Sequence, residues 1–399
     1  MHGSTSVPAG VLTVTSLDFT ATAALHQDMI LSNPGALYAS QNLLYMAIPE
    51  EQSNYTGYGL DATWIHGFEL MGATATYQGS GRVTGHVLNQ FSLDEYQGNL
   101  RVATSTGHVP SPTVHSTVSV LGWEGNRLLS KGAVDNIAPT EDIRAVRFIG
   151  PRGYVVTFKK TDPLFVLDLA DPAAPKMQGE LKIPGFSTYI HPLDDQHLLS
   201  MGYDADDQGS FAYFNGIQLQ IMNVADPANP SLLFKETIGT RGSSSEALTD
   251  HLAFNYFAEK KMLAIPMTIC EGGGNGKFSD VLTFTGLLVY DVTVDTGFKL
   301  HGRVPHPAPS GYFGGTSLPT CSNWWTNASS PVKRSAFIED YILSLGDALV
   351  KVDPLANLGT SVATFPRRYG SLSGVDGIRM PTQQPLPANP WHDPREQRG

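Results

Sequence analysis

Apolar residues recur in short alternating runs along most of the chain, and this alternation predicts β-strands. Runs of about four to eight residues, rich in Val, Leu, Ile, Phe and Tyr, alternate with polar residues as in a strand with one buried face. Gly and Pro interrupt these runs at short intervals, with 40 Gly and 27 Pro among 399 residues. Such frequent interruption leaves little room for long helices. The pattern therefore predicts an all-β protein.

One type of apolar run recurs at intervals that define a repeat. The runs begin at Val11, Trp64, Thr117, Leu164, Leu219, Leu287 and Leu349. Their spacings are 53, 53, 47, 55, 68 and 62 residues. A repeat of about 50 residues fits one four-stranded blade of a β-propeller with its loops, and it is too long for a leucine-rich or hexapeptide solenoid. The sequence therefore predicts a β-propeller of four-stranded antiparallel blades.

The two clearest copies of the repeat can be divided strand by strand. The first copy has its four runs near Ile143, Tyr154, Leu164 and Lys176. Both copies end their third strand in nearly the same turn, ADPAAP from Ala170 and ADPANP from Ala225. In such a turn the Asp side chain accepts hydrogen bonds from backbone amides, while Pro fixes φ and lacks a donor, so the strand ends there. We interpret both turns as structural.

The repeats divide the chain into a short extension, a propeller and a tail. Six complete blades are expected from Ala36 to about Phe365, and two strands between Val11 and Ile30 form an incomplete first blade. The propeller thus covers residues 11–366, after an N-terminal extension of residues 1–10. Residues 367–399 form a Pro-rich tail, in which the run from Ser371 to Met380 could supply one strand that closes the ring. We expect seven blades, or eight if further sequence joins the ring.

Charge and hydropathy exclude two classes of partner. Lys and Arg total 26 against 37 Asp and Glu, and the resulting net charge of -11 disfavours nucleic acid, since it repels a polyanion. No stretch approaches the roughly 18 uninterrupted apolar residues of a membrane-spanning helix. The first residues, MHGSTSVPAG, lack the basic and apolar segments of a signal peptide. We therefore expect no nucleic acid partner, no transmembrane segment and no export signal in this chain.

Three long segments resemble a known family. Residues 89–107 (NQFSLDEYQGNLRVATSTG), 146–192 (VRFIGPRGYVVTFKKTDPLFVLDLADPAAPKMQGELKIPGFSTYIHP) and 324–347 (WWTNASSPVKRSAFIEDYILSLGD) closely resemble the secreted β-propeller domain family of bacteria and archaea, which is distantly similar to WD40 repeats. The resemblance implies a propeller fold and a secreted, cell-surface or periplasmic location, but no reaction. Family members usually carry more propeller sequence upstream, so the resemblance also implies that this chain is the C-terminal portion of a larger protein.

Polar residues precede or begin the first strand of five successive predicted blades. In a propeller these strands converge on the central channel, and concave convergence is typical of ligand sites. The candidate ligand-binding residues at the channel mouth are Asn89, Gln90, Glu141, Arg144, Tyr189, His191, Glu246, Asp250, His251 and Arg334. Their oxygens and imidazoles could bind a divalent cation such as Ca²⁺ or orient a polar ligand. Alternatively, they are hydrogen-bonded residues that line the channel without a ligand.

A short acidic run is a second and weaker candidate for a metal site. YDADDQG places Asp204, Asp206 and Asp207 in a predicted turn, where clustered carboxylates could bind Ca²⁺. The following SFAYFNG supplies neither spaced oxygen ligands nor the distal Glu of an EF-type loop. The run is therefore more typical of a solvated acidic turn, whose carboxylates face water.

The two cysteines, Cys270 and Cys321, belong to neither a CxxC nor a zinc-binding pattern. Because the resemblance implies an exported protein, it favours a disulfide between them over two buried free thiols. The bond would close a loop of about 50 residues.

The sequence lacks the GxSxG, HExxH, GxGxxG and Walker signatures of common catalytic and nucleotide sites. It therefore favours a binding or scaffolding propeller, extracytoplasmic as the resemblance implies, whose loop face contacts a protein, a glycan or a surface. The alternative is a metal-dependent propeller hydrolase or lyase with a Ca²⁺-type cation at the channel mouth. A third hypothesis is that an upstream module of the same precursor carries the activity.

Overall fold

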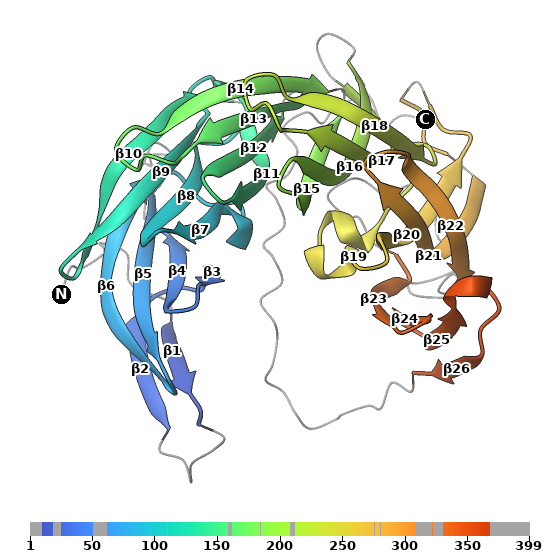
Figure 1. Ribbon diagram of the computed structural model, residues 1–399, viewed down its shortest axis with the longest axis horizontal. Coiled ribbons are helices and arrows are strands. Elements are labelled where there is room, and N and C mark those ends of the chain that lie inside the picture. The colour runs from blue at the N-terminus through green and yellow to red at the C-terminus, as the bar shows by residue number, and fades with distance from the viewer. Residues whose placement is uncertain are drawn as a thin grey trace, which may run out of the picture. The chain divides into compact units, whose positions relative to one another are not determined.

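The chain is built of β-strands joined by turns and short 3-10 helices (Figure 1). The computed structural model describes residues 10–18, 25–50, 62–109, 111–158, 162–183, 185–207, 212–274, 276–279, 281–307, 321 and 330–367. No helix in these ranges has the length and apolar character needed to cross a membrane. The described residues form two compact units. Among the described residues, unit 1 extends to Glu180 except for Asp162. Unit 2 consists of Asp162 and the residues from Leu181 onward.

Unit 1 contains three sheets, of two, eight and four strands. The two-stranded sheet consists of β1 (Val11–Ser16) and β2 (His26–Leu31). The eight-stranded sheet consists of β3 (Ala36–Ala39), β4 (Leu43–Pro49), β5 (Ala62–Met71), β6 (Thr74–Thr84), β7 (Leu93–Tyr96), β8 (Asn99–Thr106), β9 (His115–Glu124) and β10 (Arg127–Ile137). The four-stranded sheet consists of β11 (Asp142–Ile149), β12 (Arg152–Phe158), β13 (Asp162–Asp168) and β14 (Lys176–Ile183).

The eight-stranded sheet consists of two four-stranded blades that touch at their fourth strands. A short parallel ladder joins β6 to β10, with Arg127 opposite Ser80 and Leu128 opposite Gly81. The two strands can approach this closely because Gly81 has no side chain, since a Cβ at this position would overlap the Leu128 carbonyl oxygen. The eight strands therefore count as two repeats of the same unit.

Unit 2 contains three four-stranded antiparallel sheets. The first consists of β15 (Phe186–Asp194), β16 (His197–Asp207), β17 (Ala212–Asn223) and β18 (Ser231–Ile238). The second consists of β19 (Asn255–Phe257), β20 (Met262–Glu271), β21 (Val281–Thr293) and β22 (Gly297–Pro305). The third consists of β23 (Val332–Ile338), β24 (Tyr341–Gly346), β25 (Leu349–Pro354) and β26 (Ala363–Pro366). The 3-10 helices of the two units are η1 (Gln90–Ser92), η2 (Glu246–Leu248), η3 (His251–Ala253) and η5 (Leu355–Asn357).

These sheets confirm the predicted repeat of four antiparallel strands. Six four-stranded sets run from Ala36 to Pro366, and the recurrent runs from Trp64 to Leu349 all lie in the third strand of their set. The first run forms β1, which pairs only with β2 among the described residues, so the first blade is incomplete as expected. The extension up to residue 9 and the tail strand predicted near Ser371 lie outside the described residues, and the proposed domain limits stay predictions.

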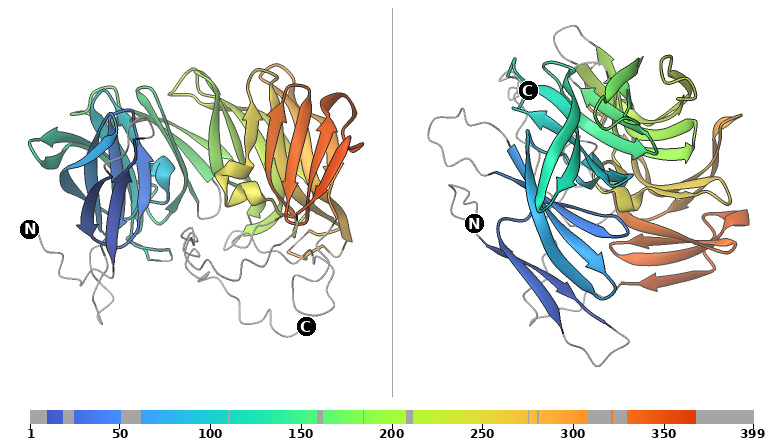
Figure 2. Two further views of the ribbon diagram at one scale, coloured as in Figure 1. Left: turned by 90° about the horizontal axis from the view of Figure 1, so that it is seen from below. Right: turned by 60° about the vertical axis from the view of Figure 1, so that its left-hand side comes forward.

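Middle strands such as β4 are buried on both faces, because each face packs on a neighbouring sheet. In β4, Tyr45 and Ala47 belong to a cluster that includes Leu100 of β8, while Met46 and Ile48 belong to another cluster. The second cluster includes Leu12, Val14, Ile30 and Leu44, and Figure 2 shows β1 and β2 beside this face. Adjacent residues point to opposite faces of a strand, so four consecutive buried residues require cover on both sides.

The two Asp-Pro turns have the predicted geometry. Asp171 accepts a hydrogen bond from the Ala173 amide at 2.9 Å, and Asp226 accepts one from the Ala228 amide at 3.0 Å. The Asn229 side-chain amide and the backbone amides of the turn hold the pKa of Asp226 below its ordinary value. Each turn therefore holds its own backbone and connects the third strand to the fourth.

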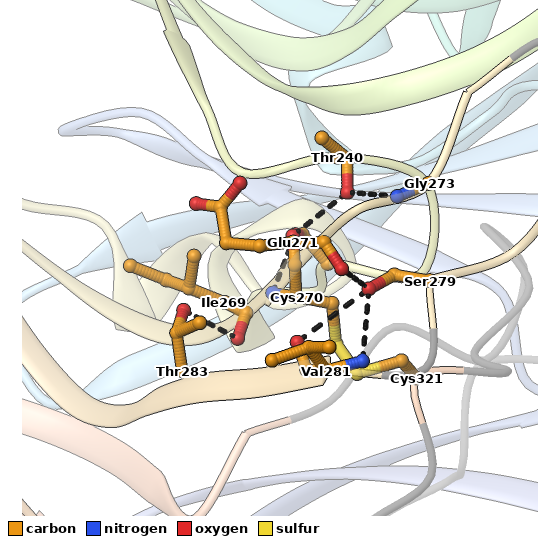
Figure 3. The surroundings of a disulfide bond; sticks show 10 residues. Thr240, Ile269, Cys270, Glu271, Gly273, Ser279, Val281, Thr283 and Cys321 are labelled. Carbon is orange, nitrogen blue, oxygen red and sulfur yellow. Dashed lines mark hydrogen bonds between the residues drawn. A yellow bond between two sulfur atoms is a disulfide. The ribbon is translucent and has the colours of Figure 1, made fainter.

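A disulfide joins Cys270, the next-to-last residue of β20, to Cys321, which precedes β23 (Figure 3). The exposed fractions of the two residues are 0% and 5%. The Cys270 carbonyl accepts from the Thr240 amide at 2.7 Å, and the Cys270 amide donates to the Ser243 hydroxyl at 2.9 Å. Gly242, with φ +104°, lies against the Cys321 carbonyl where a side chain would overlap it. The disulfide predicted from the resemblance is thus present.

Loss of the disulfide should destabilise the protein mainly through the unfolded state. The Cys270→Ala/Cys321→Ala variant should lose up to about 4 kcal/mol of unfolding free energy, since the bond closes a 51-residue separation. Urea unfolding of the oxidised protein, the reduced protein and the variant measures this difference. Equal midpoints for all three, or complete alkylation of both thiols without reductant, would contradict a structural bond.

His306 is a buried imidazole beside the last sheet of unit 2. Its exposed fraction is 5%, and its Nε2 lies 2.7 Å from the Ser344 hydroxyl of β24. Burial lowers the pKa of His306 from about 6.5 to about 4, and the nearby Lys351 charge acts in the same direction. The imidazole is therefore neutral in the folded protein at neutral pH.

This shift predicts a loss of stability in mild acid. Between about pH 6.5 and pH 4 the unfolded chain takes up a proton at His306 that the folded protein does not, so the unfolding free energy should fall by about 3 kcal/mol as the pH decreases. Urea unfolding across this range would show a shallower decline for His306→Gln, whose amide is neutral throughout. Parallel curves of unfolding free energy against pH for the variant and the natural protein would mean that His306 does not contribute to the loss of stability in acid.

Candidate functional site

Six of the ten candidate residues lie in unit 2, on or just ahead of the first strand of each sheet. Tyr189 and His191 lie on β15, Arg334 lies on β23, and the other three precede β19 in the turns of η2 and η3, namely Glu246, Asp250 and His251. Figure 1 shows these turns next to β19. The repeat therefore placed all six residues on the first strand of their set or in the turns that precede it.

Two local caps fix the turns ahead of β19. The Ser245 hydroxyl accepts from the Ala247 amide at 3.2 Å and begins η2, which carries Glu246. The Asp250 carboxylate accepts from the Leu252 amide at 3.0 Å and begins η3, which carries His251. Ser and Asp are favoured at such positions because their short side chains satisfy amides that the helix leaves without partners.

Five rings from β15, from η3 with the residue after it, and from β19 form one contiguous cluster, here called the aromatic surface: Tyr189, His191, His251, Phe254 and Tyr256. Ring centroids are 4.9 Å apart for Tyr189 and Phe254, and 5.4 Å apart for His191 and Tyr256. Phe254 is buried at the centre, and the other four rings are half-buried. Burial, together with the Asp194 charge, raises the pKa of Tyr256 above its ordinary value, so its hydroxyl remains a donor at neutral pH.

Two ion pairs connect the turns ahead of β19 to the start of β23. The Lys333 ammonium lies 2.8 Å from the Glu246 carboxylate, and the Arg334 guanidinium lies 2.6 Å from the Asp250 carboxylate. Lys333 also lies 3.8 Å from the Asp347 carboxylate. Glu246 further accepts from the Ser330 amide at 3.3 Å. Two of the carboxylates predicted to bind a cation or a ligand, Glu246 and Asp250, are thus bonded to protein cations.

The other four candidate residues lie in unit 1 and make local contacts. Asn89 caps η1 by accepting from the Phe91 amide at 3.0 Å, and Glu141 accepts from the Thr157 hydroxyl at 2.6 Å. Arg144 lies 3.0 Å from the Asp142 carboxylate of its own strand. Gln90 differs from these three, because it lines a cavity in unit 1. Whether any of the ten residues binds a ligand stays a prediction.

The acidic run lies in a strand and not in the predicted turn. β16 continues to Asp207, because its ladder with β17 extends to the pair Asp207 and Ala212. Asp204 pairs with Lys235 at 2.5 Å, and Asp206 accepts from the Asn215 amide at 2.9 Å. Within the described ranges, no group of three or more His, Cys, Asp or Glu could hold a metal ion. The Asp207 side chain lies outside these ranges, and the Ca²⁺ site stays a prediction.

Sequence reasoning missed two rings of the aromatic surface, Phe254 and Tyr256, and the Arg147 side chain that lines the cavity in unit 1. Phe254 and Tyr256 follow the polar turn with a spacing of two, and this alternation could have placed both on the same side as His191 of β15. Arg147 lies among the apolar residues of β11, and a cation among apolar residues of a strand is a signal for a special environment.

The chain is similar to longer proteins from two archaea. An uncharacterized protein of Methanocaldococcus jannaschii is 37% identical over 188 residues, which are 47% of this chain and 28% of that protein. An uncharacterized protein of Archaeoglobus fulgidus is 36% identical over 189 residues, again 47% of this chain and 28% of that protein. The matched part therefore spans little more than a quarter of the length of these relatives.

Solved structures with similar architecture have little sequence identity to this chain. The periplasmic gluconolactonase PpgL of Pseudomonas aeruginosa has a TM-score of 0.46 and 11% identity, with 89% of this chain and 95% of that chain covered. The WD40 domain of Neurospora crassa Pan2 has a TM-score of 0.40 and 8% identity, with coverage of 82% and 78%. Similarity at this level assigns no function.

One family model covers most of the sequence. The model described as "Beta propeller domain" matches residues 2–358. This range includes the incomplete first blade, the first five four-stranded sets and most of the sixth. The chain belongs to the β-propeller domain family.

Proposed function

We propose that this chain is the recognition module of an extracytoplasmic protein, and that it binds a protein or glycan partner through the aromatic surface without converting it. The observation that carries the proposal is the aromatic surface itself. The buried ring of Phe254 contacts Tyr189 and His191, and these two half-buried rings contact the half-buried rings of His251 and Tyr256. Rigid rings with a polar edge supply large contact area at low entropic cost, and they are enriched in binding sites for this reason.

The charges beside the aromatic surface support binding over turnover. A carboxylate that acts as a general base or metal ligand must be available to the substrate or the metal. Glu246 and Asp250 are instead bonded to Lys333 and Arg334, and these pairs join two neighbouring sheets. In this arrangement the pairs hold the backbone that presents the rings.

The disulfide supports a location outside the cytoplasm. Stable disulfides form in oxidising compartments and are rare in reducing ones. The bond between Cys270 and Cys321 is buried, which is typical of a structural disulfide. The greater length of the archaeal relatives is consistent with a module that belongs to a larger exported protein.

A photo-crosslinker in place of Tyr256 should capture the partner in the extracytoplasmic fraction of the native host. The matched control carries the same crosslinker in place of Tyr341, a tyrosine of β24 with an exposed fraction of 41%. We expect one adduct of defined mass at position 256 and none at position 341. A glycan array, read with the natural protein and with Tyr256→Ala, tests a carbohydrate partner in the same way.

Two results would contradict the proposal. The first is the absence of both an adduct at position 256 and an array signal that depends on Tyr256. The second is turnover of a small substrate that Glu246→Gln abolishes while folding is retained. The latter result would favour a catalytic role for the same surface.

The ion pairs make a separate prediction about stability. A double-mutant cycle with Glu246→Gln and Lys333→Met should give a favourable coupling of about 0.5–1 kcal/mol in the unfolding free energy, since the pair is partly exposed. Urea unfolding of the four proteins measures the coupling. A coupling of zero would mean that the pair does not hold β23 to the turn of η2.

A further inference from the structure

His306 joins the second sheet of unit 2 to the third. It follows β22 of the second sheet, where its amide donates to the Thr285 carbonyl at 2.9 Å and its carbonyl accepts from the Thr285 hydroxyl at 2.6 Å. Its imidazole faces the third sheet, because Nε2 lies 2.7 Å from the hydroxyl of Ser344 in β24. The exposed fractions of His306 and Ser344 are 5% and 0%. A titratable group is therefore buried where these two sheets meet.

A continuous series of contacts leads from His306 to the aromatic surface. Ser344 pairs with Ser335 in the ladder between β24 and β23. The carbonyl and the hydroxyl of Ser335 both accept from the side-chain amide of Asn255 in β19, at 3.0 Å and 3.1 Å. Asn255 immediately precedes Tyr256, whose ring belongs to the aromatic surface. The position of the third sheet therefore affects the strand that carries this ring.

The third sheet also holds the turns ahead of β19. β23 lies beside β19, β20 and η3 (Figure 1). Near its start, Lys333 pairs with Glu246 and Arg334 pairs with Asp250, and these two carboxylates belong to the turns of η2 and η3. Displacement of β23 would break both ion pairs together with the contacts of Asn255. The turns that position the rings would then lose their support.

The surroundings of His306 disfavour a charged imidazole. Burial lowers the pKa of His306 most, and the Lys351 charge lowers it further. The Lys351 ammonium also donates to the last carbonyl of β22 at 2.6 Å. The two carboxylates of the third sheet nearest in sequence have other contacts, since Asp347 lies 3.8 Å from Lys333 and Asp353 accepts from the Ser361 hydroxyl at 3.1 Å. The charged groups on the elements around His306 are Arg303, Lys333, Asp347, Lys351, Asp353 and Arg367.

Acid should therefore favour a state in which the imidazole has left the interface, here called the open state. The pKa of His306 is about 4 while the interface is closed, and an imidazole in water has a pKa of about 6.5. Between these values the open state binds a proton that the closed state does not. From pH 7 to pH 5 the ratio of open to closed molecules should rise roughly 20-fold, and the gain levels off below pH 4, where both states are charged.

We propose that His306 is a pH switch for the aromatic surface, in which proton uptake by the buried imidazole releases β23 and β24 from the second sheet and frees the turns that position the rings. Buried histidines that change charge in mild acid act in this way at interfaces. The partner binds at neutral pH and is released in mild acid. This consequence rests on the proposed function, whereas the opening itself can be measured in the free protein.

Hydrogen–deuterium exchange of the free protein at pH 7 and pH 5, corrected for the intrinsic effect of pH, tests the opening. Peptides from residues 245–257 and 332–346 should lose protection roughly 20-fold at pH 5. Their exchange should depend less on low urea concentrations than that of β16–β17, because a local opening exposes less surface than global unfolding. In His306→Gln, whose amide does not titrate, protection should be nearly equal at both pH values.

Two further variants complete the comparison. His115→Gln, in β9 of unit 1, is the matched control and should respond to pH as the natural protein does. Lys351→Met keeps the imidazole and removes the neighbouring charge, so it should respond less than the natural protein. This variant tests the switch even where His306→Gln does not fold.

The photo-crosslinker at position 256 connects the opening to binding. Its adduct should form at pH 7 and be lost at pH 5 in the natural background, and it should persist at pH 5 in His306→Gln. Any of three results would overturn the switch: equal protection at both pH values, a folded His306→Gln that responds like the natural protein, or the same urea dependence in all these peptides. The absence of an adduct even at pH 7, in a protein that opens in acid, would contradict the proposed function instead.

Discussion

The structure depends on covering both faces of each four-stranded sheet. The middle strands bury consecutive residues, as in β4, where Tyr45 and Met46 point into different cores. A sheet of this kind cannot stand alone in water, because burial of one face leaves the other exposed. Repetition of the four-stranded set removes this exposure, because each set covers one face of the sheet on either side of it. The two strands β1 and β2 follow the same rule by covering the free face of β4 and β5.

This constraint also explains where polar chemistry can occur. Middle strands bury most of their side chains, so accessible candidate chemistry gathers on the first strands and the turns ahead of them. In unit 2 these positions carry the aromatic surface and the pairs of Glu246 and Asp250 with their cations. In unit 1 they carry the cavity beside Arg147. Rings and cations are presented by a rigid backbone, which suits recognition because little entropy is lost when a partner binds.

The repeat could be predicted from the sequence because alternation and spacing are local signals. The third strands and the Asp171 and Asp226 turns follow directly from the order of residues. The acidic run at Asp204 was misplaced because Asp and Gly suggest a turn, whereas pairing with β17 extends the strand. The contacts of Arg147 with Phe91 and of His191 with Tyr256 join residues from different elements that are far apart in the sequence. A local sequence pattern does not reveal which distant residues come into contact, so these partners could be identified only from the structure.

Hydrogen–deuterium exchange tests the central claim that the fold rests on four-stranded sets with covered faces. Peptides from the inner pairs β16–β17 and β20–β21 should exchange only through global unfolding, because their amides are paired and both faces are buried. Peptides from the turn at residues 225–230 should exchange orders of magnitude faster. Comparable exchange rates for the inner pairs and this turn would contradict the account, since they would show that the sheets are not the cooperative units of the structure.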